Sequence, residues 1–232
     1  MRNVPYPLRK FGFIAAPRFG LFGIVIIAVV WATAISSRAA EVPSVWFSPL
    51  SRKNDAEFVQ TVKKLQLTRE IARSFVQEKK IAALKRPLIS KGTIVLSKQG
   101  VCLATRSPFV SAVKITRDGI GQKVGNQKAT VKKSSDHFEI KHTARILMAL
   151  FTADKVELTN EFSVYYQRVE GVFQIGLKPK DKILSKIISN IVIEGSGDIR
   201  RITIREANGD STVIRITDDA PLQQVTLETC IR

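Results

Sequence analysis

The chain has 232 residues, 44% of them hydrophobic, and its 37 Lys and Arg against 20 Asp and Glu give a net charge of +17. This length suits one domain of ordinary size with a substantial core. The basic residues occur as scattered doublets without alternating aromatic residues, which argues against a base-stacking nucleic-acid surface and favours a solvated basic face. The surplus charge also suits anionic lipid head groups or an acidic partner.

The first 39 residues predict a secretory signal peptide. A basic head with Arg9, Lys10 and Arg18 precedes an unbroken apolar stretch over 19–35, and Ser37-Arg38-Ala39 places small residues where a signal peptidase reads. The alternative is an uncleaved membrane anchor, although an apolar stretch of about 17 residues falls just short of the ~20 that span a bilayer. Either way, we expect the rest of the chain to be exported.

Residues 40–54 predict an extended lead-in with Pro43 and Pro49, and residues 55–232 predict a single domain. Asn54 or Asp55 can cap a helix that runs to Leu65, because Phe58, Val62 and Leu65 fall on one helical face. In the next segment, the spacing of apolar residues changes from a helical period to that of a strand. Residues 71–77 alternate between two faces, as in a strand with one apolar side.

Most of the remaining chain predicts strands joined by short turns. Arg117-Asp118-Gly119 is a strong hairpin signal, and a second helix is expected over 140–152. Residues 130–131 lie in a lysine-rich stretch of little pattern. The strands are expected over 93–96, 101–105, 110–116, 120–124, 162–167, 172–177, 191–193, 199–205 and 212–217. Their spacing of roughly ten residues indicates an antiparallel meander, and the two helices make the class α+β.

A long, one-sided antiparallel sheet must curl, and its inner face then needs a cover. Two helices with modest apolar stripes are available for this role. We therefore expect incomplete closure, with a groove lined by Phe, Ile, Leu and Val. Grooves of this kind hold acyl chains.

The two cysteines, Cys102 and Cys230, can form a disulfide in an oxidising compartment. This bond would tie the last residues to a strand near the middle of the chain. The alternative is two unpaired thiols, one in a strand and one near the C-terminus.

No pattern for catalysis or metal binding emerges. The two histidines, His137 and His142, lie near Asp136 and Glu139 without a third ligand cluster, so surface histidines at a helix start are the simpler interpretation. Asp154, Glu157 and Glu161 are expected to be solvated, and Gly195-x-Gly197 predicts a hairpin turn. We predict no enzyme, no cofactor and no metal.

Several short motifs follow one another along the chain. The first half has Phe75-x-Gln77, then Pro87-Leu88-x-Ser90-x-Gly92-x-Ile94, then Gly100-Val101-Cys102-Leu103-x-Thr105-x-x-Pro108. The second half has Ile146-Leu147-x-x-Leu150-Phe151, Phe162-x-Val164, Gly171-x-Phe173-x-Ile175-x-Leu177-x-Pro179-Lys180, Ile202-x-Ile204 and Asn208-Gly209-Asp210. The order of these motifs resembles the LolA-like family of periplasmic outer-membrane lipoprotein carriers, and the resemblance covers about residues 55–217. It departs from the family at Leu103, where relatives often have Trp.

This resemblance implies an open, strongly curved antiparallel half-barrel with a few helices as a lid over a hydrophobic cavity. It implies a non-enzymatic periplasmic carrier that shields the acyl chains of a lipoprotein or other lipid cargo. The implied partners are an inner-membrane release complex and an outer-membrane acceptor, with the carrier itself a monomer that binds no nucleic acid. Candidate cavity residues are Phe75, Ile94, Leu96, Leu103, Val113, Ile115, Phe162, Val164, Phe173 and Ile175 on the sheet, with Leu147 and Phe151 on the lid.

Each candidate residue is equally compatible with a closed, dry core. Two other functions remain open at this point. One is an envelope sensor or adaptor of the same fold, held at the membrane by an uncleaved leader. The other is a basic surface for an anionic envelope polymer.

Overall fold

The computed structural model describes residues 44–65, 69–135, 144, 148–149, 155–218, 221 and 224–232, all of which belong to the compact unit Val42–Arg232. The predicted leader over 1–39 lies outside the described residues. So does most of the predicted helix over 140–152, including Leu147 and Phe151. Its described residues Ala144, Met148 and Ala149 are helical and buried.

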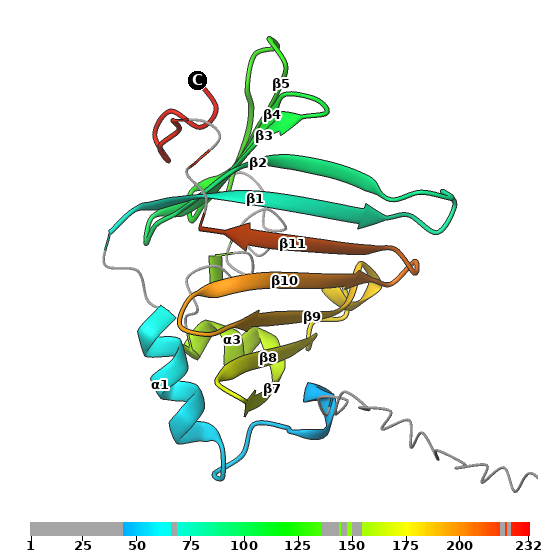
Figure 1. The fold of residues 1–232 in the computed structure, drawn as a ribbon. Coiled ribbons are helices and arrows are strands. Elements are labelled where there is room, and N and C mark those ends of the chain that lie inside the picture. The colour runs from blue at the N-terminus through cyan, green and yellow to red at the C-terminus, as the bar shows by residue number, and fades with distance from the viewer. Residues whose placement is uncertain are drawn as a thin grey trace, which may run out of the picture. The chain divides into compact units, whose positions relative to one another are not determined.

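The domain is built on one sheet of eleven antiparallel strands (Figure 1) in the order β6-β5-β4-β3-β2-β1-β11-β10-β9-β8-β7. The strands form two meanders, β1 to β6 and β7 to β11, which meet where β1 pairs with β11. The first meander comprises β1 (Ile71–Lys80), β2 (Leu88–Leu96), β3 (Gly100–Ser107), β4 (Ser111–Thr116), β5 (Gly119–Val124) and β6 (Thr130–Lys133). The second comprises β7 (Phe162–Val169), β8 (Val172–Pro179), β9 (Ile188–Gly195), β10 (Ile199–Glu206) and β11 (Ser211–Thr217). The predicted α+β class with an open antiparallel sheet is confirmed.

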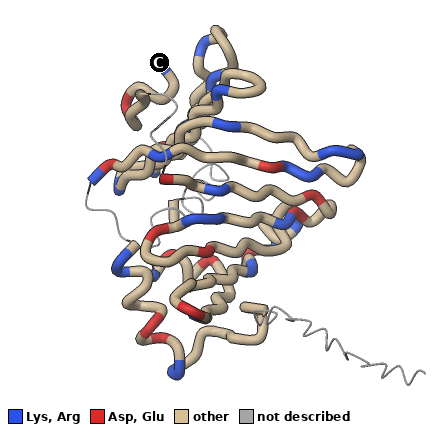
Figure 2. The backbone as a smooth tube through the Cα atoms, in the orientation of Figure 1, with Lys and Arg blue, Asp and Glu red and all other residues tan. Residues whose placement is uncertain are grey.

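The strand register separates the sheet into an apolar inner face and a mainly polar outer face. On β1, Phe75 and Gln77 point to the inner face, and successive partners of Gln77 across β11 to β7 are Ile214, Ile202, Ile193, Ile175 and Tyr166. Lys, Arg, Asp and Glu positions recur along and across the strands (Figure 2), and the outer face carries ion pairs such as that between Arg201 and Glu194. Strand periodicity thus assigns each side chain to a face.

Helix α1 (Asp55–Leu65) has the predicted bounds and covers part of the inner face. Its first turn carries Asp55 and Glu57 and its last turn Lys63 and Lys64, which complements the helix dipole. The buried Phe58, Val62 and Leu65 join the main core, as their spacing predicts. A short helix, α3 (Lys155–Glu161), leads into β7 and buries Leu158 and Glu161, although the sequence analysis expected Glu161 to be solvated.

Two chain segments cover parts of the outer face. The lead-in forms a short 3-10 helix, η1 (Val45–Phe47), in which Trp46 packs edge-on against Tyr165, with ring centroids 5.2 Å apart, and over Gly176. Residues 48–50 then bond the free edge of β7, since Leu50 N–H donates to the Val164 carbonyl and Tyr166 N–H to the Ser48 carbonyl, both at 2.9 Å. A second 3-10 helix, η2 (Leu184–Lys186), connects β8 to β9.

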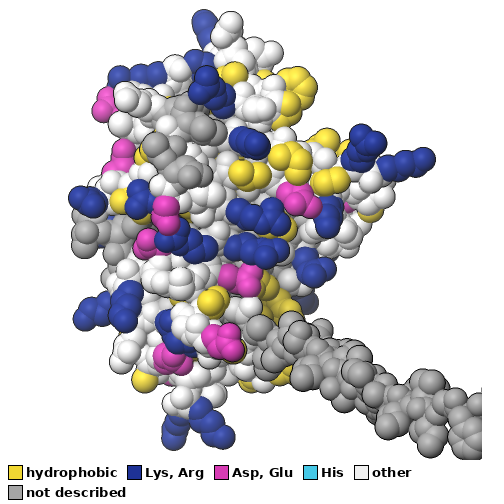
Figure 3. Space-filling view, in the orientation of Figure 1, with side chains coloured by type: hydrophobic (Ala, Val, Ile, Leu, Met, Phe, Trp, Pro, Cys, Tyr) yellow, Lys and Arg dark blue, Asp and Glu magenta, His cyan; other side chains and the backbone are white. Residues whose placement is uncertain are grey.

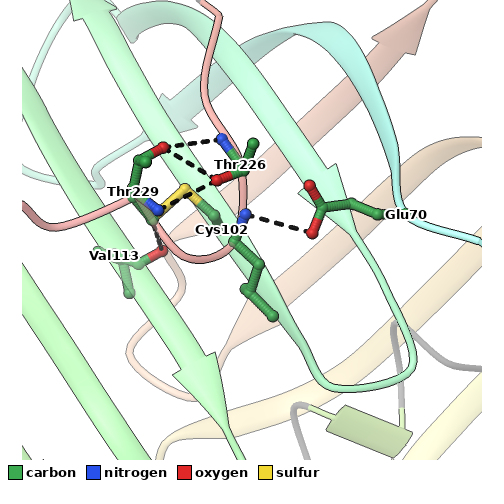
Figure 4. The surroundings of a disulfide bond; sticks show 7 residues. Glu70, Cys102, Val113, Thr226 and Thr229 are labelled. Atoms are coloured by element: carbon green, nitrogen blue, oxygen red, sulfur yellow. Dashed lines mark hydrogen bonds between the residues drawn. A yellow bond between two sulfur atoms is a disulfide. The ribbon is translucent and has the colours of Figure 1, made fainter.

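The C-terminal segment lies on the outer face over β2 to β5, and a disulfide between Cys102 and Cys230 attaches it there (Figure 4). Leu227 and Cys230 pack with Val95, Ala104 and Ala112 in a second, smaller core. The backbone N–H of Leu227 also donates to Glu70 Oε2 at 3.3 Å. The final residues are therefore an ordered part of the domain.

Several elements differ from the sequence predictions. Strands β1 and β2 extend to Lys80 and from Leu88, so their hairpin is longer than the predicted strands over 71–77 and 93–96. The lysine-rich residues 130–133 form β6, an exposed edge strand. Lysine on an edge strand discourages pairing with other chains. A lysine-rich segment with little apolar pattern is therefore suited to the edge of the sheet.

Candidate functional site

The inner face is covered over much of its area, and buried residues of α1, of α3 and of the helical segment at Met148 and Ala149 share one core cluster with the strands. Eight of the candidate cavity residues are at most 8% exposed and belong to one core cluster with Phe58, Val62 and Leu158 of these helices. They are Phe75, Ile94, Leu96, Ile115, Phe162, Val164, Phe173 and Ile175. In the structure as it stands, these side chains form the core, and a ligand would reach them only if the helices moved.

The inner face is open near the first residues of β2 and the turn between β3 and β4. A groove of about 440 Å³ lies here, which we call the inner-face groove. Its lining residues are Gln77, Leu88, Ile89, Ser90, Leu103, Thr105, Pro108, Phe109, Ser111 and Val113. This volume is within the range of about 300–1,000 Å³ that is common for small-molecule sites.

The floor of the groove continues into the core. Leu103 and Val113, the two remaining candidates on the sheet, are directly paired across β3 and β4. Both are half-buried and pack against the core cluster. A ligand in the groove would therefore contact apolar side chains that are continuous with the domain interior.

The rim of the groove exposes large apolar side chains. Phe109 is 77% exposed, Leu88 50% and Ile89 44%. A contiguous exposed apolar patch on a monomeric protein marks an interaction or ligand-binding surface. Figure 3 shows the opposite, outer face, on which hydrophobic side chains over β1 and β2 also lie beside basic side chains at the tip of their hairpin.

A β-bulge helps to shape the opening. The register between β2 and β3 shifts between Lys91 and Gly92, so that Lys91 faces Ser107 while Gly92 faces Thr105. A Cβ at Gly92 would lie only 2.1 Å from the Ala104 carbonyl oxygen, which requires glycine at this close approach. Bulges bend a strand and increase its local twist, so the ends of β2 and β3 beyond Gly92 are re-aimed where the groove begins.

The other sizeable hollows have more polar linings. One of about 460 Å³ lies against the outer face of β4 to β6 and is lined by Lys114, Arg117, Asp118 and Lys133, among others. Another, of about 350 Å³, lies between β3 to β5 and the C-terminal segment, with Lys123, Asn126 and Arg232 in its wall. A more apolar hollow beside Leu65 and Ile216 has only about 40 Å³ of free space. The inner-face groove is the best match to an apolar ligand.

Nothing in the described part of the chain assembles a reactive centre. Both cysteines are in the disulfide, and His137 and His142 lie outside the described residues. Across residues 44–135 and 155–232, so far as they are described, no group of His, Cys, Asp and Glu is suited to hold a metal ion. Within the same residues, no helix combines the length and apolarity needed to cross a membrane. The groove can bury an apolar chain by contact alone.

The sequence analysis missed the rim residues Leu88, Ile89 and Phe109. The strands expected from the sequence begin at Thr93 and Val110, so Leu88, Ile89 and Phe109 fall outside them. The sequence does contain a signal for them, because a proline followed by two apolar residues occurs twice, in Pro87-Leu88-Ile89 and Pro108-Phe109-Val110. A basic residue lies one or two positions before each proline.

Comparison with known proteins gives a clear family, and the solved structures named here are distant in sequence. No curated protein matches the sequence. A LolA superfamily protein from Nitrosomonas europaea shares 6% identity, covering 76% of this chain and 97% of its own, with a TM-score of 0.41. A putative outer membrane lipoprotein-sorting protein domain from Vibrio parahaemolyticus shares 10% identity over 79% and 95%, with a TM-score of 0.40. A DUF1329 family protein from Desulfovibrio piger shares 9% identity over 75% and 94%, with a TM-score of 0.41.

These structural likenesses are too slight to support an argument about function. The family assignment rests on sequence, because residues 51–221, well over half of the chain, match a family model described as outer membrane lipoprotein carrier protein LolA-like. This range agrees with the 55–217 over which the motifs resemble that family. The chain belongs to the LolA-like outer membrane lipoprotein carrier family.

Proposed function

We propose that this protein is a non-enzymatic carrier that shields the acyl chain of a lipidated cargo in the inner-face groove. The observation that supports this most directly is the continuity between an exposed apolar rim, a half-buried floor at Leu103 and Val113, and the core. Burying each methylene contributes about 0.8 kcal/mol, so retention needs no chemistry.

In this proposal the cargo is a lipoprotein or another lipid, and the carrier works as a monomer in the periplasm after export by its leader. It would receive cargo from an inner-membrane release complex and deliver it to an outer-membrane acceptor. Family membership and the apolar groove support this part of the proposal.

The eight buried candidate residues suggest that a long acyl chain binds in two stages. A short acyl segment fits the open groove, whereas a longer chain would reach Phe75 or Ile94 only after α1 separates from the sheet. The twelve candidate residues, Leu147 and Phe151 included, thus remain the proposed lining of the loaded state.

The proposal is tested by placing a charge on the groove floor. Val113→Asp should abolish uptake of a fluorescent fatty acid such as cis-parinaric acid, while circular dichroism shows a folded sheet. Val213→Asp is the matched control, because Val213 is also a half-buried strand valine but lies on the outer face opposite Glu78. Equal uptake by both variants would contradict the groove as the site, and no uptake by the native protein would favour the adaptor role.

A further inference from the structure

We propose that the cargo of the inner-face groove is an acyl chain with an anionic head group, a carboxylate or a phosphate, held at the basic end of the β1–β2 hairpin. This inference rests on the proposed carrier function and specifies its substrate class. It is argued from the charge around the groove, since the groove lining itself contains no charged residue.

The segment that builds the groove is uniformly basic. Residues 79–117 contain nine Lys and Arg and no Asp or Glu, and every lining residue except Gln77 comes from this segment. In the whole chain the ratio of basic to acidic residues is only 37 to 20. Within this segment, Lys85 and Arg86 lie in the β1–β2 hairpin next to Leu88 of the rim, whereas Lys98 and Arg117 lie in turns at the opposite ends of the strands.

Some of these basic groups are already neutralised. Lys79 Nζ lies 3.0 Å from Glu206 Oε1, and Lys80 Nζ lies 3.7 Å from Glu78 Oε1. The nearby carboxylate of Asp210 accepts a hydrogen bond from the Ala82 backbone. These acidic residues lie on the β1 and β10–β11 side of the hairpin and have partners of their own.

Lys85 and Arg86, between β1 and β2, are different. Both are exposed, and no acidic side chain pairs with either of them in the part of the chain that the structure describes. Two residues of extended chain span about 7 Å, so Arg86 lies within reach of a head group seated beside Leu88. The side chains of the hairpin tip can therefore approach the head of a molecule whose tail lies in the groove.

The chemistry of these groups selects an anion. A guanidinium binds a carboxylate or phosphate through two parallel hydrogen bonds, and a lysine adds a point charge. A neutral diacylglycerol or ester head would leave the same cations with water alone. The arrangement of apolar rim, apolar floor and unpaired cations therefore suits an acidic amphiphile better than a neutral one.

The experiment compares ligands that share one chain and differ only in head charge. Displacement of a fluorescent fatty acid is measured with palmitate against methyl palmitate, and with palmitoyl lysophosphatidate against monopalmitoyl glycerol. We expect the acidic member of at least one pair to bind about threefold to tenfold more tightly at low salt, as two exposed charge contacts allow. High salt should reduce this difference but leave the neutral ligand unaffected. The pair that shows the difference identifies a carboxylate or a phosphate as the source.

The double variant Lys85→Gln/Arg86→Gln should remove most of this preference without weakening the neutral ligands. Its matched control is Arg52→Gln/Lys53→Gln, which removes the same two charged groups from an exposed turn before α1. Equal binding of acidic and neutral ligands, or a preference unchanged in the hairpin variant, would overturn the inference while leaving the carrier function intact. Binding of no ligand at all would instead contradict the carrier function.

Discussion

Arg168 on β7 makes an ion pair with Glu57 of α1, with Nε 2.9 Å from Glu57 Oε1. The same guanidinium donates a hydrogen bond of 2.8 Å to Thr61 Oγ1, which also lies 2.8 Å from the hydroxyl of Tyr166. One arginine thus contacts two side chains one helical turn apart. It joins the helix that covers the inner face to the edge of the sheet.

Removing this contact should loosen α1. Arg168→Ala is expected to lower the free energy of unfolding by about 1–2 kcal/mol, because the ion pair is partly exposed but Thr61 is buried and loses a donor. Amide hydrogen exchange within 55–65 should accelerate. Lys155→Ala, which removes the exposed ion pair with Asp55 of the same helix, is the control and should change stability by under about 0.5 kcal/mol. Similar protection of α1 in both variants would show that apolar packing alone holds the helix.

The disulfide should contribute strongly to stability. It joins residues 128 positions apart, and loss of a native disulfide from a small secreted domain costs about 2–5 kcal/mol. We expect the Cys102→Ala/Cys230→Ala variant to unfold at a lower temperature and to lose amide protection over 225–231. Reducing agent should shift the native protein toward the variant and leave the variant unchanged. An unaltered melting temperature in reducing agent would contradict a stabilising role.

Two glycines on the sheet should respond differently to the same substitution. Gly92→Ala places a Cβ 2.1 Å from a backbone oxygen, so the bulge must move, and we expect a loss of about 2 kcal/mol or more. Gly121→Ala meets the end of the flexible Ile231 side chain at 2.4 Å, which can rotate away. Its cost should be smaller. Denaturant unfolding of the two variants checks this order, and equal losses would argue against a special role for the bulge.

The exposed rim should matter for ligand uptake and not for folding. Phe109→Ser is expected to change stability by less than about 0.5 kcal/mol, because its side chain is 77% exposed. It should nevertheless slow or weaken uptake of a fluorescent fatty acid. Phe47→Ser is the control, since Phe47 is 83% exposed in η1, a segment that does not line the groove. If the two variants take up the fatty acid equally well, the rim is not part of the entry path.

Sequence periodicity identified the faces of the sheet but not the site. The helical stripe at Phe58, Val62 and Leu65 and the Asp118-Gly119 hairpin are local patterns, and both are confirmed. Phe75 and Leu103 both point to the inner face, yet Phe75 is 1% exposed and Leu103 lines the groove. The difference depends on whether other parts of the chain pack over the residue. Strand alternation contains no information about that.

The family could be recognised because its motifs follow in order from β1 to the turn between β10 and β11, and the family model covers nearly the same residues. The charged residues on the inner face are harder to anticipate. Lys79 lies there opposite Thr212, in a row that continues to Ile204, and the paired Glu206 explains its position. Such compensation between distant strands becomes visible only once the register is known.

The ladder between β1 and β11 also has a consequence for folding. Within each meander, every strand pairs only with the strand before or after it in the sequence. By contrast, Ser74 to Lys80 of the first strand pair with Thr217 to Ser211 of the last strand. Contacts between distant residues require the largest loss of chain entropy and form slowly. The two meanders should therefore form early and independently, and the central ladder should close last, when the final strand has become available.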